Sequence, residues 1–193
     1  GAAAGDGSTC AFGPWSNIVP ASTLNGTGDE WEPALSPDGR TIVYVSYTGA
    51  AGLYAATRPS ATSTFGAPRM LTELSTSNVE HGPAWSADGT KLYFSRELAM
   101  SQPMVADYLG DGMFGTPTMF DVPSIGSAFA LSADELEVFE TVDNGSGDYD
   151  LLHATRPQIG AKWVTGGGVL SLNTSGIEAY PAFDEPRGDL YYQ

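Results

Sequence analysis

Residues 31–46 read WEPALSPDGRTIVYVS, and residues 81–96 repeat the pattern as HGPAWSADGTKLYFSR. Weaker copies occupy residues 127–141 and 179–192. The equivalent positions of the four copies, which lie about 50 residues apart, are Pro33, Pro83, Phe129 and Pro181. A period of roughly 40–50 residues that is built from short strands predicts the blades of a β-propeller.

Each repeat predicts four strands. In the first copy we expect the innermost strand at residues 32–36, a tight turn at 37–39 and a second strand at 41–46, because Pro presets the turn and Gly supplies its left-handed position. A third strand is expected at 52–59 and again at 103–107 and 150–157. Proline-containing segments at 12–20, 65–71 and 114–120 are typical of an outermost strand, which has one unpaired side.

The sequence therefore predicts an all-β protein, a β-propeller of about four four-stranded blades. We expect residues 1–11 to form a flexible leader and residues 12–193 the propeller, with a leading outermost strand at 12–20. The blades are expected at about 29–73, 79–122, 126–171 and 177–193, the last of them incomplete. A second chain could complete the ring, so a homodimer is one predicted partner arrangement.

The charge of the chain narrows the choice of partners. The 193 residues carry 8 basic and 23 acidic side chains, for a net charge of -15. Such a surface repels phosphate backbones, so we expect no nucleic acid partner and favour a protein or a glycan. No apolar run approaches the ~20 residues that a membrane span requires. We therefore expect no membrane span.

Carboxylates recur at one place in the repeat. Three copies place a glutamate three residues before the motif proline, at the entry to the innermost strand, where we expect the side chains to ring the mouth of the central channel. Gathered carboxylates would suit Ca²⁺; alternatively each accepts hydrogen bonds from backbone N–H groups of a neighbouring blade. The candidate metal ligands are Glu30, Glu80 and Glu178, with Asp143 and Asp148 from an acidic loop that could equally be a solvated turn.

The residues beside these glutamates suggest a ligand site. Trp31 and His81 follow two of them, and flat rings stack on sugars and on peptide side chains; the alternative for Trp31 is packing between blades. His81 has no evident nucleophile beside it, so we assign no catalytic residue. The ligand-binding candidates are Glu30, Trp31, Glu80, His81, Glu178 and Tyr180.

The pattern Pro-x-x-Ser-Pro-Asp-Gly-x-x-Ile-x-Tyr of residues 33–44 resembles the repeats of TolB-like β-propeller proteins, and residues 83–94 match it nearly as well. Residues 53–58, LYAATR, are similar to the third strand of secreted bacterial members. The resemblance covers about residues 12–193. The third copy departs from it, with Glu135 at the turn glycine, and so does the fourth at residues 184–188. The resemblance implies a bacterial protein that is periplasmic, attached to the envelope or secreted.

The leading functional hypothesis is a non-enzymatic extracytoplasmic binding or scaffold module that engages protein or glycan at the channel mouth. One alternative is a metal-assisted polysaccharide lyase that uses His81 and the glutamates. The scarcity of Lys and Arg counts against the lyase, because a uronate carboxylate needs a basic partner. Another alternative is a self-assembling structural protein joined through unpaired terminal strands. The sequence leaves open the ligand and the number of blades in the assembled propeller.

Overall fold

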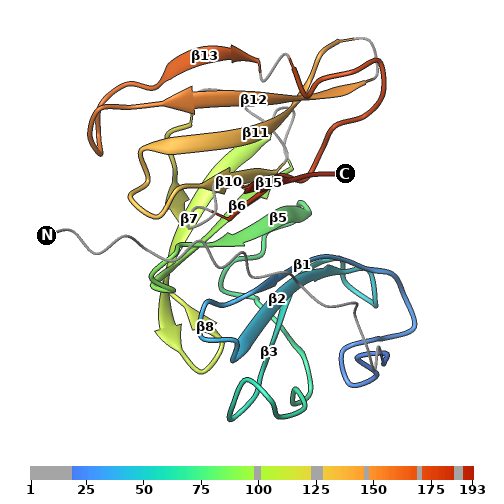
Figure 1. Ribbon diagram of the computed structural model, residues 1–193. Coiled ribbons are helices and arrows are strands. Elements are labelled where there is room, and N and C mark those ends of the chain that lie inside the picture. Colours follow the sequence, from blue (N-terminus) through green and yellow to red (C-terminus); the bar gives the residue numbers. More distant parts are fainter. Residues whose placement is uncertain (1–18, 98–100, 123–127, 146–147, 169–170, 185–188) are drawn as a thin grey trace, which may run out of the picture.

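The computed structural model describes residues 19–97, 101–122, 128–145, 148–168, 171–184 and 189–193. These residues form only strands, turns and loops, and the sheets stack beside one another (Figure 1). No helix in the described ranges could cross a membrane. The predicted leader at 1–11 and most of the predicted strand at 12–20 lie outside the described residues, and residues 19 and 20 belong to no strand.

The strands form four antiparallel sheets, which confirms the predicted fold class. In chain order, the first sheet contains β1 (Glu30–Leu35), β2 (Thr41–Ser46), β3 (Gly52–Thr57) and β4 (Arg69–Met70). The second contains β5 (Glu80–Trp85), β6 (Lys91–Arg96), β7 (Gln102–Gly110), β8 (Met113–Phe114) and β9 (Thr118–Met119). The third contains β10 (Phe129–Leu131), β11 (Glu137–Asp143), β12 (Tyr149–Thr155) and β13 (Val164–Gly168). The fourth pairs β14 (Ala182–Asp184) with β15 (Asp189–Tyr191).

The second sheet differs from the prediction at its outer side. Its third strand does not stop at Asp107 but continues to Gly110, where Asp111 and Gly112 adopt positive φ angles of 51° and 72°. The chain therefore turns back as a hairpin, and Phe114 belongs to β8 rather than to the outermost strand. The strand β9 takes the outer place against β7 instead. In the first sheet the outermost strand is likewise shorter than the predicted 65–71.

A serine and an aspartate shape the turn between the two inner strands of each of the first three sheets. In the first sheet the Ser36 hydroxyl donates to Asp38 Oδ1 at 2.6 Å and accepts the backbone N–H of Thr41 at 2.9 Å. Asp38 Oδ1 also accepts the backbone N–H of Arg40 at 2.9 Å. The same bonds recur around Ser86 and Ser132. The Ser-x-Asp pattern of the sequence is thus a hydrogen-bonded turn.

The turn also explains the departure of the third repeat from the motif. Gly39 and Gly89 have φ angles of 68° and 71°, and Glu135 occupies the same left-handed position with a φ of 58°. Its side chain crosses to the second sheet, where Glu135 Oε1 accepts from Lys91 Nζ at 2.9 Å and from the Tyr93 hydroxyl at 2.6 Å. Arg156 lies 3.9 Å from its other oxygen. These contacts offset the strain of a non-glycine residue at this position.

The core lies between sheets rather than within one. On one face of β6, the fully buried Leu92 and Phe94 join Val43, Val45 and Leu53 of the first sheet. On the opposite face, Tyr93 packs against residues of the third sheet, Phe129 and Val138 among them. Alternate side chains of β6 therefore pack against two different sheets, the first on one face and the third on the other. Because the sheets are held side by side in this way, their innermost strands converge on a common space.

We predict that Ser36→Ala lowers the free energy of unfolding by about 1–2 kcal/mol, because the buried N–H of Thr41 loses its side-chain acceptor and Asp38 loses a donor. Urea unfolding measures this loss. Ser60→Ala, at an exposed serine in a loop, is the matched control and should change stability by less than about 0.5 kcal/mol. Equal effects of the two substitutions would contradict the role of the turn.

Glu135→Gln should destabilise the protein at neutral pH and much less in acid. Burial alone would raise the pKa of Glu135, but Tyr93, Lys91 and Arg156 together hold it below its usual value. A carboxyl with a lowered folded-state pKa stabilises the fold above its unfolded pKa, and this contribution disappears as the pH falls through the folded pKa. Urea unfolding of both proteins at about pH 7 and about pH 3 measures the difference. A gap in stability that does not shrink in acid would contradict the ionic part of this contact.

Candidate functional site

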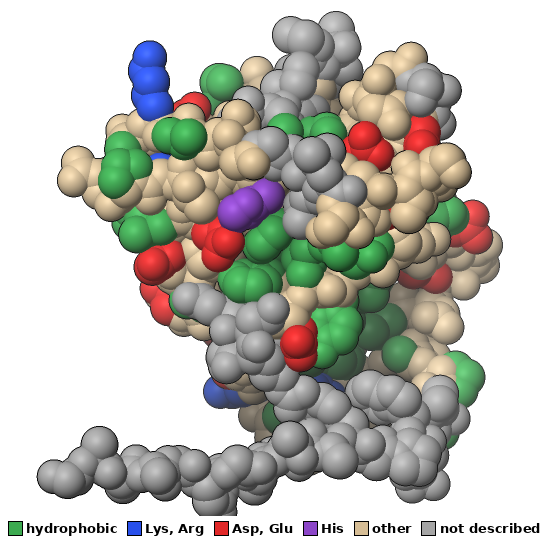
Figure 2. Space-filling view, turned by 45° about the horizontal axis from the view of Figure 1, so that its top comes forward, with side chains coloured by type: hydrophobic (Ala, Val, Ile, Leu, Met, Phe, Trp, Pro, Cys, Tyr) green, Lys and Arg blue, Asp and Glu red, His purple; other side chains and the backbone are tan. Residues whose placement is uncertain are grey.

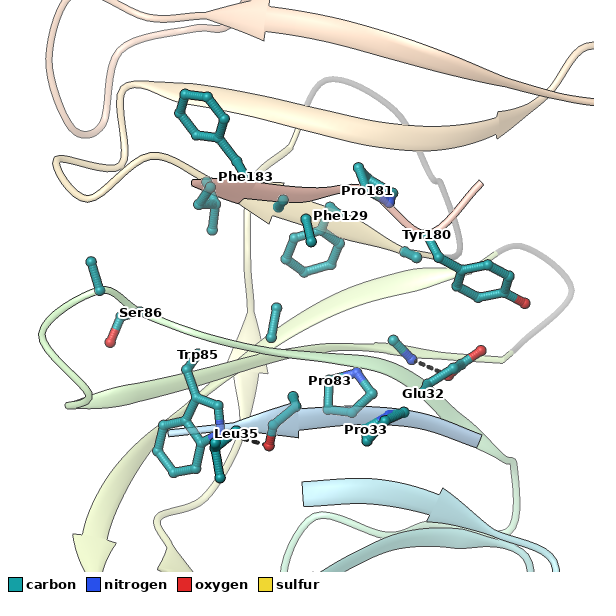
Figure 3. A pocket seen from close by; sticks show the side chains of 18 of the residues that line it. Glu32, Pro33, Leu35, Pro83, Trp85, Ser86, Phe129, Tyr180, Pro181 and Phe183 are labelled. Carbon is teal, nitrogen blue, oxygen red and sulfur yellow. Dashed lines mark hydrogen bonds between the residues drawn. The ribbon is translucent and has the colours of Figure 1, made fainter. Parts of the chain in front are cut away.

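A cavity of about 610 Å³ lies among the innermost strands of the four sheets. Its wall is largely apolar: prolines, alanines and the rings of Trp85, Phe129 and Phe183 line it (Figure 3). Two hydrogen bonds tie β1 to β5 along the wall, from the Trp85 indole N–H to the carbonyl of Ala34 and from the Gly82 N–H to Glu32. The cavity is the central channel that the repeat pattern predicts.

A second hollow, of about 290 Å³, adjoins this cavity, and we call it the mouth. Figure 3 shows Glu32 and Tyr180 at one end of the cavity and Trp85, Leu35 and Ser86 at the other. Trp31, Glu32 and Tyr180 line both hollows, so the two spaces lie next to each other. The residues that line the mouth are Asp29, Trp31, Glu32, Tyr47, His81 and Tyr180.

Three large aromatic side chains of the mouth are exposed. Trp31 is 54% exposed, Tyr47 44% and Tyr180 43%. The alternative that Trp31 packs between blades is therefore wrong. Exposed rings that gather around one hollow are typical of a binding surface, because their burial by a ligand removes apolar area from water.

Backbone bulges bring these side chains to the mouth. The residue before the motif proline has a positive φ in three copies: 54° at Glu32, 58° at Gly82 and 55° at Tyr180. In β1 and β5 the pairing register shifts at the same place. A left-handed conformation costs a glycine little but costs other residues about 1–2 kcal/mol. Where one copy has glycine, two others have a large side chain, Glu32 or Tyr180, despite that cost, and strain of this kind is often found at binding sites.

The charged centre of the mouth is a carboxylate–imidazole pair. The Glu32 side chain is largely buried, and its Oε2 accepts the Gly82 N–H at 2.6 Å and lies 3.8 Å from His81 Nδ1. On the other side of the ring, His81 Nε2 lies 3.5 Å from Glu97, whose side chain is exposed. The imidazole thus sits between two carboxylates that come from different sheets.

These contacts shift the pKa values of the pair in opposite directions. Burial would raise the pKa of Glu32, but interactions with His81, Gly82 and Tyr180 lower it overall. The pKa of His81 is raised, chiefly by Glu32 and further by Glu97, against the effect of burial. Burial and the Glu32 charge raise the pKa of Tyr180. Both shifts favour the ionised form of the Glu32–His81 pair.

The three predicted channel glutamates lie elsewhere. Each carboxylate accepts hydrogen bonds from the loop just before it in the chain: Glu30 from the Gly26 N–H at 3.0 Å, Glu80 from Thr76, and Glu178 from the Thr174 N–H at 2.9 Å. Glu80 also pairs with Arg96 at 3.1 Å. None of the three lines the cavity or the mouth, and each serves its own loop rather than a neighbouring blade.

The described residues do not form a group of ligands that would support the predicted calcium site. Among them, no three His, Cys, Asp or Glu side chains lie close enough together to hold a metal ion. In the acidic loop, Asp143 accepts the N–H of Gly145 at 2.7 Å and Asp148 that of Tyr149 at 3.0 Å. Residues 146–147 of that loop lie outside the described residues. Calcium binding stays an untested prediction.

The mouth therefore combines predicted and missed residues. Trp31, His81 and Tyr180 come together as predicted candidates, whereas Asp29, Glu32 and Tyr47 were not among them. A signal for Glu32 existed in the sequence. It shares the pre-proline position with Gly82, and a glycine at one repeat position indicates an unusual backbone conformation at all of them.

The His81–Glu32 pair predicts a specific pH dependence of stability. A histidine whose pKa is raised on folding stabilises the fold below its unfolded pKa, and this contribution is lost as the pH rises through the folded pKa. His81→Gln should therefore lower the free energy of unfolding more at about pH 5.5 than at about pH 9. Urea unfolding across this range measures it, and NMR titration of His81 should give a pKa above 6.5. A loss of stability that is independent of pH would contradict the ion pair.

Comparison with known proteins supports the fold. No protein-family model matches the sequence, and no curated protein matches it. TolB from Acinetobacter baumannii aligns with a TM-score of 0.59 at 18% identity, over 88% of this chain and 39% of that structure. A putative TolB from Agrobacterium tumefaciens aligns with a TM-score of 0.54 at 17% identity, over 88% of this chain and 56% of that one. A gluconolactonase from Xanthomonas campestris aligns with a TM-score of only 0.41, which is too low to indicate a shared fold.

The chain thus spans less than two thirds of the length of either TolB structure. At such low identities the likeness shows the architecture alone, and that architecture is the β-propeller.

Proposed function

We propose that this chain is a non-enzymatic binding module of the TolB-like type, acts outside the cytoplasm, and engages a protein or a glycan at the mouth. The observation that carries the proposal is the set of three exposed rings around the Glu32–His81 pair, open to an apolar cavity. The Ser-Pro-Asp-Gly repeats and the likeness to two TolB structures support the TolB-like assignment and, through it, the location.

The lining of the two hollows favours binding over the lyase alternative. Among the described residues, neither hollow has a lysine or an arginine in its wall, so a uronate carboxylate would find no basic partner there. His81 is held between Glu32 and Glu97, which favour its protonated form, and an imidazole that already carries a proton cannot act as a general base. Binding alone accounts for the aromatic rings and the apolar lining of the channel. Self-assembly through strand edges stays a separate prediction.

A library experiment tests this proposal. Random displayed peptides and a glycan array are presented to the wild-type protein, and the enriched binders are then measured against variants. We expect Trp31→Ala to weaken these binders by about tenfold or more, because a ring at the centre of an interface contributes disproportionately to affinity. The expected contribution follows from its exposure and from its position in both hollows.

Leu109→Ala provides the matched control, since Leu109 is 67% exposed on β7 and lines neither hollow. Its affinity for the same binders should equal that of the wild type. Failure of both libraries to yield a binder, or equal loss in both variants, would overturn the proposed site.

A further inference from the structure

The composition of the mouth indicates the charge of its ligand. Its aromatic rings, Trp31, Tyr47 and Tyr180, present faces that attract cations as well as apolar groups. Asp29 and Glu32 add two carboxylates to the same wall. The Asp29 side chain forms no hydrogen bond or ion pair with the part of the chain that the structure describes, so its charge is available to a ligand. Rings combined with carboxylates are typical of sites for organic cations.

The chain as a whole carries the same sign of charge. The chain has a net charge of -15, and Figure 2 shows acidic side chains spread over the face that it draws, with few basic ones. Glu97, beside His81, adds a third carboxylate at the edge. A field of this sign raises the local concentration of cationic partners and disfavours anionic ones. It argues against a uronate or another acidic ligand.

We propose that the mouth binds a guanidinium or ammonium group, the side chain of an arginine or lysine in an extended segment of a partner protein. The inference rests on the proposed function and specifies its ligand class. The cation lies among the rings of Trp31, Tyr47 and Tyr180, beside the carboxylates of Asp29 and Glu32. The adjoining cavity, walled by prolines, alanines and aromatic rings, takes an apolar residue next to the basic one.

His81 gives this site an internal competitor. Its imidazolium, when protonated, neutralises part of the Glu32 charge and repels a second cation, so ligand and proton compete for the same carboxylate. Binding should therefore strengthen as the pH rises and His81 loses its proton. The charged and titratable groups that face His81 are Glu32, Glu97, Asp29, Tyr47 and Tyr180. Of these, the two tyrosines have raised pKa values and stay neutral over the range of interest.

A matched pair of peptides tests the proposal. N-acetyl-Ala-Arg-Ala-amide and its citrulline counterpart have nearly the same shape, but only the first is charged. Each is titrated into the ¹⁵N-labelled protein, with the indole resonance of Trp31, assigned through Trp31→Phe, as the readout. We expect the arginine peptide to shift this resonance and to bind at least about fivefold more tightly than the citrulline peptide.

Charge variants locate the effect. Glu32→Gln and Asp29→Asn should each weaken the arginine peptide by about threefold or more while leaving the citrulline peptide unchanged. Among the described residues nothing pairs with the Asp29 side chain, so Asp29→Asn remains informative if Glu32→Gln disturbs the fold. Glu137→Gln is the control, because Glu137 also pairs with a histidine, His153, at 2.7 Å, but lines neither hollow. His81→Gln should tighten binding at about pH 6 and remove the pH dependence.

The outcomes separate this inference from the proposed function. Equal affinity of the two peptides, or no effect of either charge variant, overturns the cationic ligand. If neutral peptides or glycans from the libraries still depend on Trp31, the binding module stands and only its ligand class is wrong. If neither the libraries nor the arginine peptide gives a Trp31-dependent signal, both proposals fall.

Discussion

No sheet of this protein can bury its own two faces, and this constraint organises the molecule. A strand such as β6 must place Leu92 and Phe94 against one neighbour and Tyr93 against the other. At about 25 cal/mol per Å² of apolar area, the interfaces between blades contribute far more than any single hydrogen bond. The sheets therefore stack side by side around an axis. This packing fixes their positions, and their innermost strands enclose the cavity.

The same repeat explains how much of the structure could be predicted. The strand at 41–46 has the predicted bounds, because its alternation and the preceding Ser-Pro-Asp-Gly turn agree with each other. The β7–β8 hairpin was missed because Asp111 adopts a left-handed conformation that few residues other than glycine favour. At the outer edge, packing against the first sheet decided the path of the chain, and no local pattern records that contact.

The site shows where reasoning by period fails. A strict period of two would assign the side chains of β1 to alternate faces, but the bulge between Trp31 and Ala34 breaks the alternation and brings Glu32 to the mouth. Glu80 and Glu178 were expected there because they recur before the motif proline. They recur for another reason, since a threonine four residues earlier donates both its N–H and its hydroxyl to each of them. The recurring glutamates thus mark a structural loop. The mouth is marked instead by Glu32, which stands where another copy of the repeat has a glycine.

The β7–β8 hairpin ties the second sheet to the first. It reaches across to the first sheet, where Arg69 donates to the Gly112 carbonyl at 2.7 Å and the Tyr108 hydroxyl meets Thr41 Oγ1 at 2.7 Å. Phe114 completes the shared core. The first two blades are consequently joined by hydrogen bonds as well as by apolar packing, and an ionisable side chain, Glu135, joins the third blade to the second. The mouth residues of β1 and β5 thus belong to the two blades that the hairpin joins, whereas Tyr180 comes from a different part of the ring.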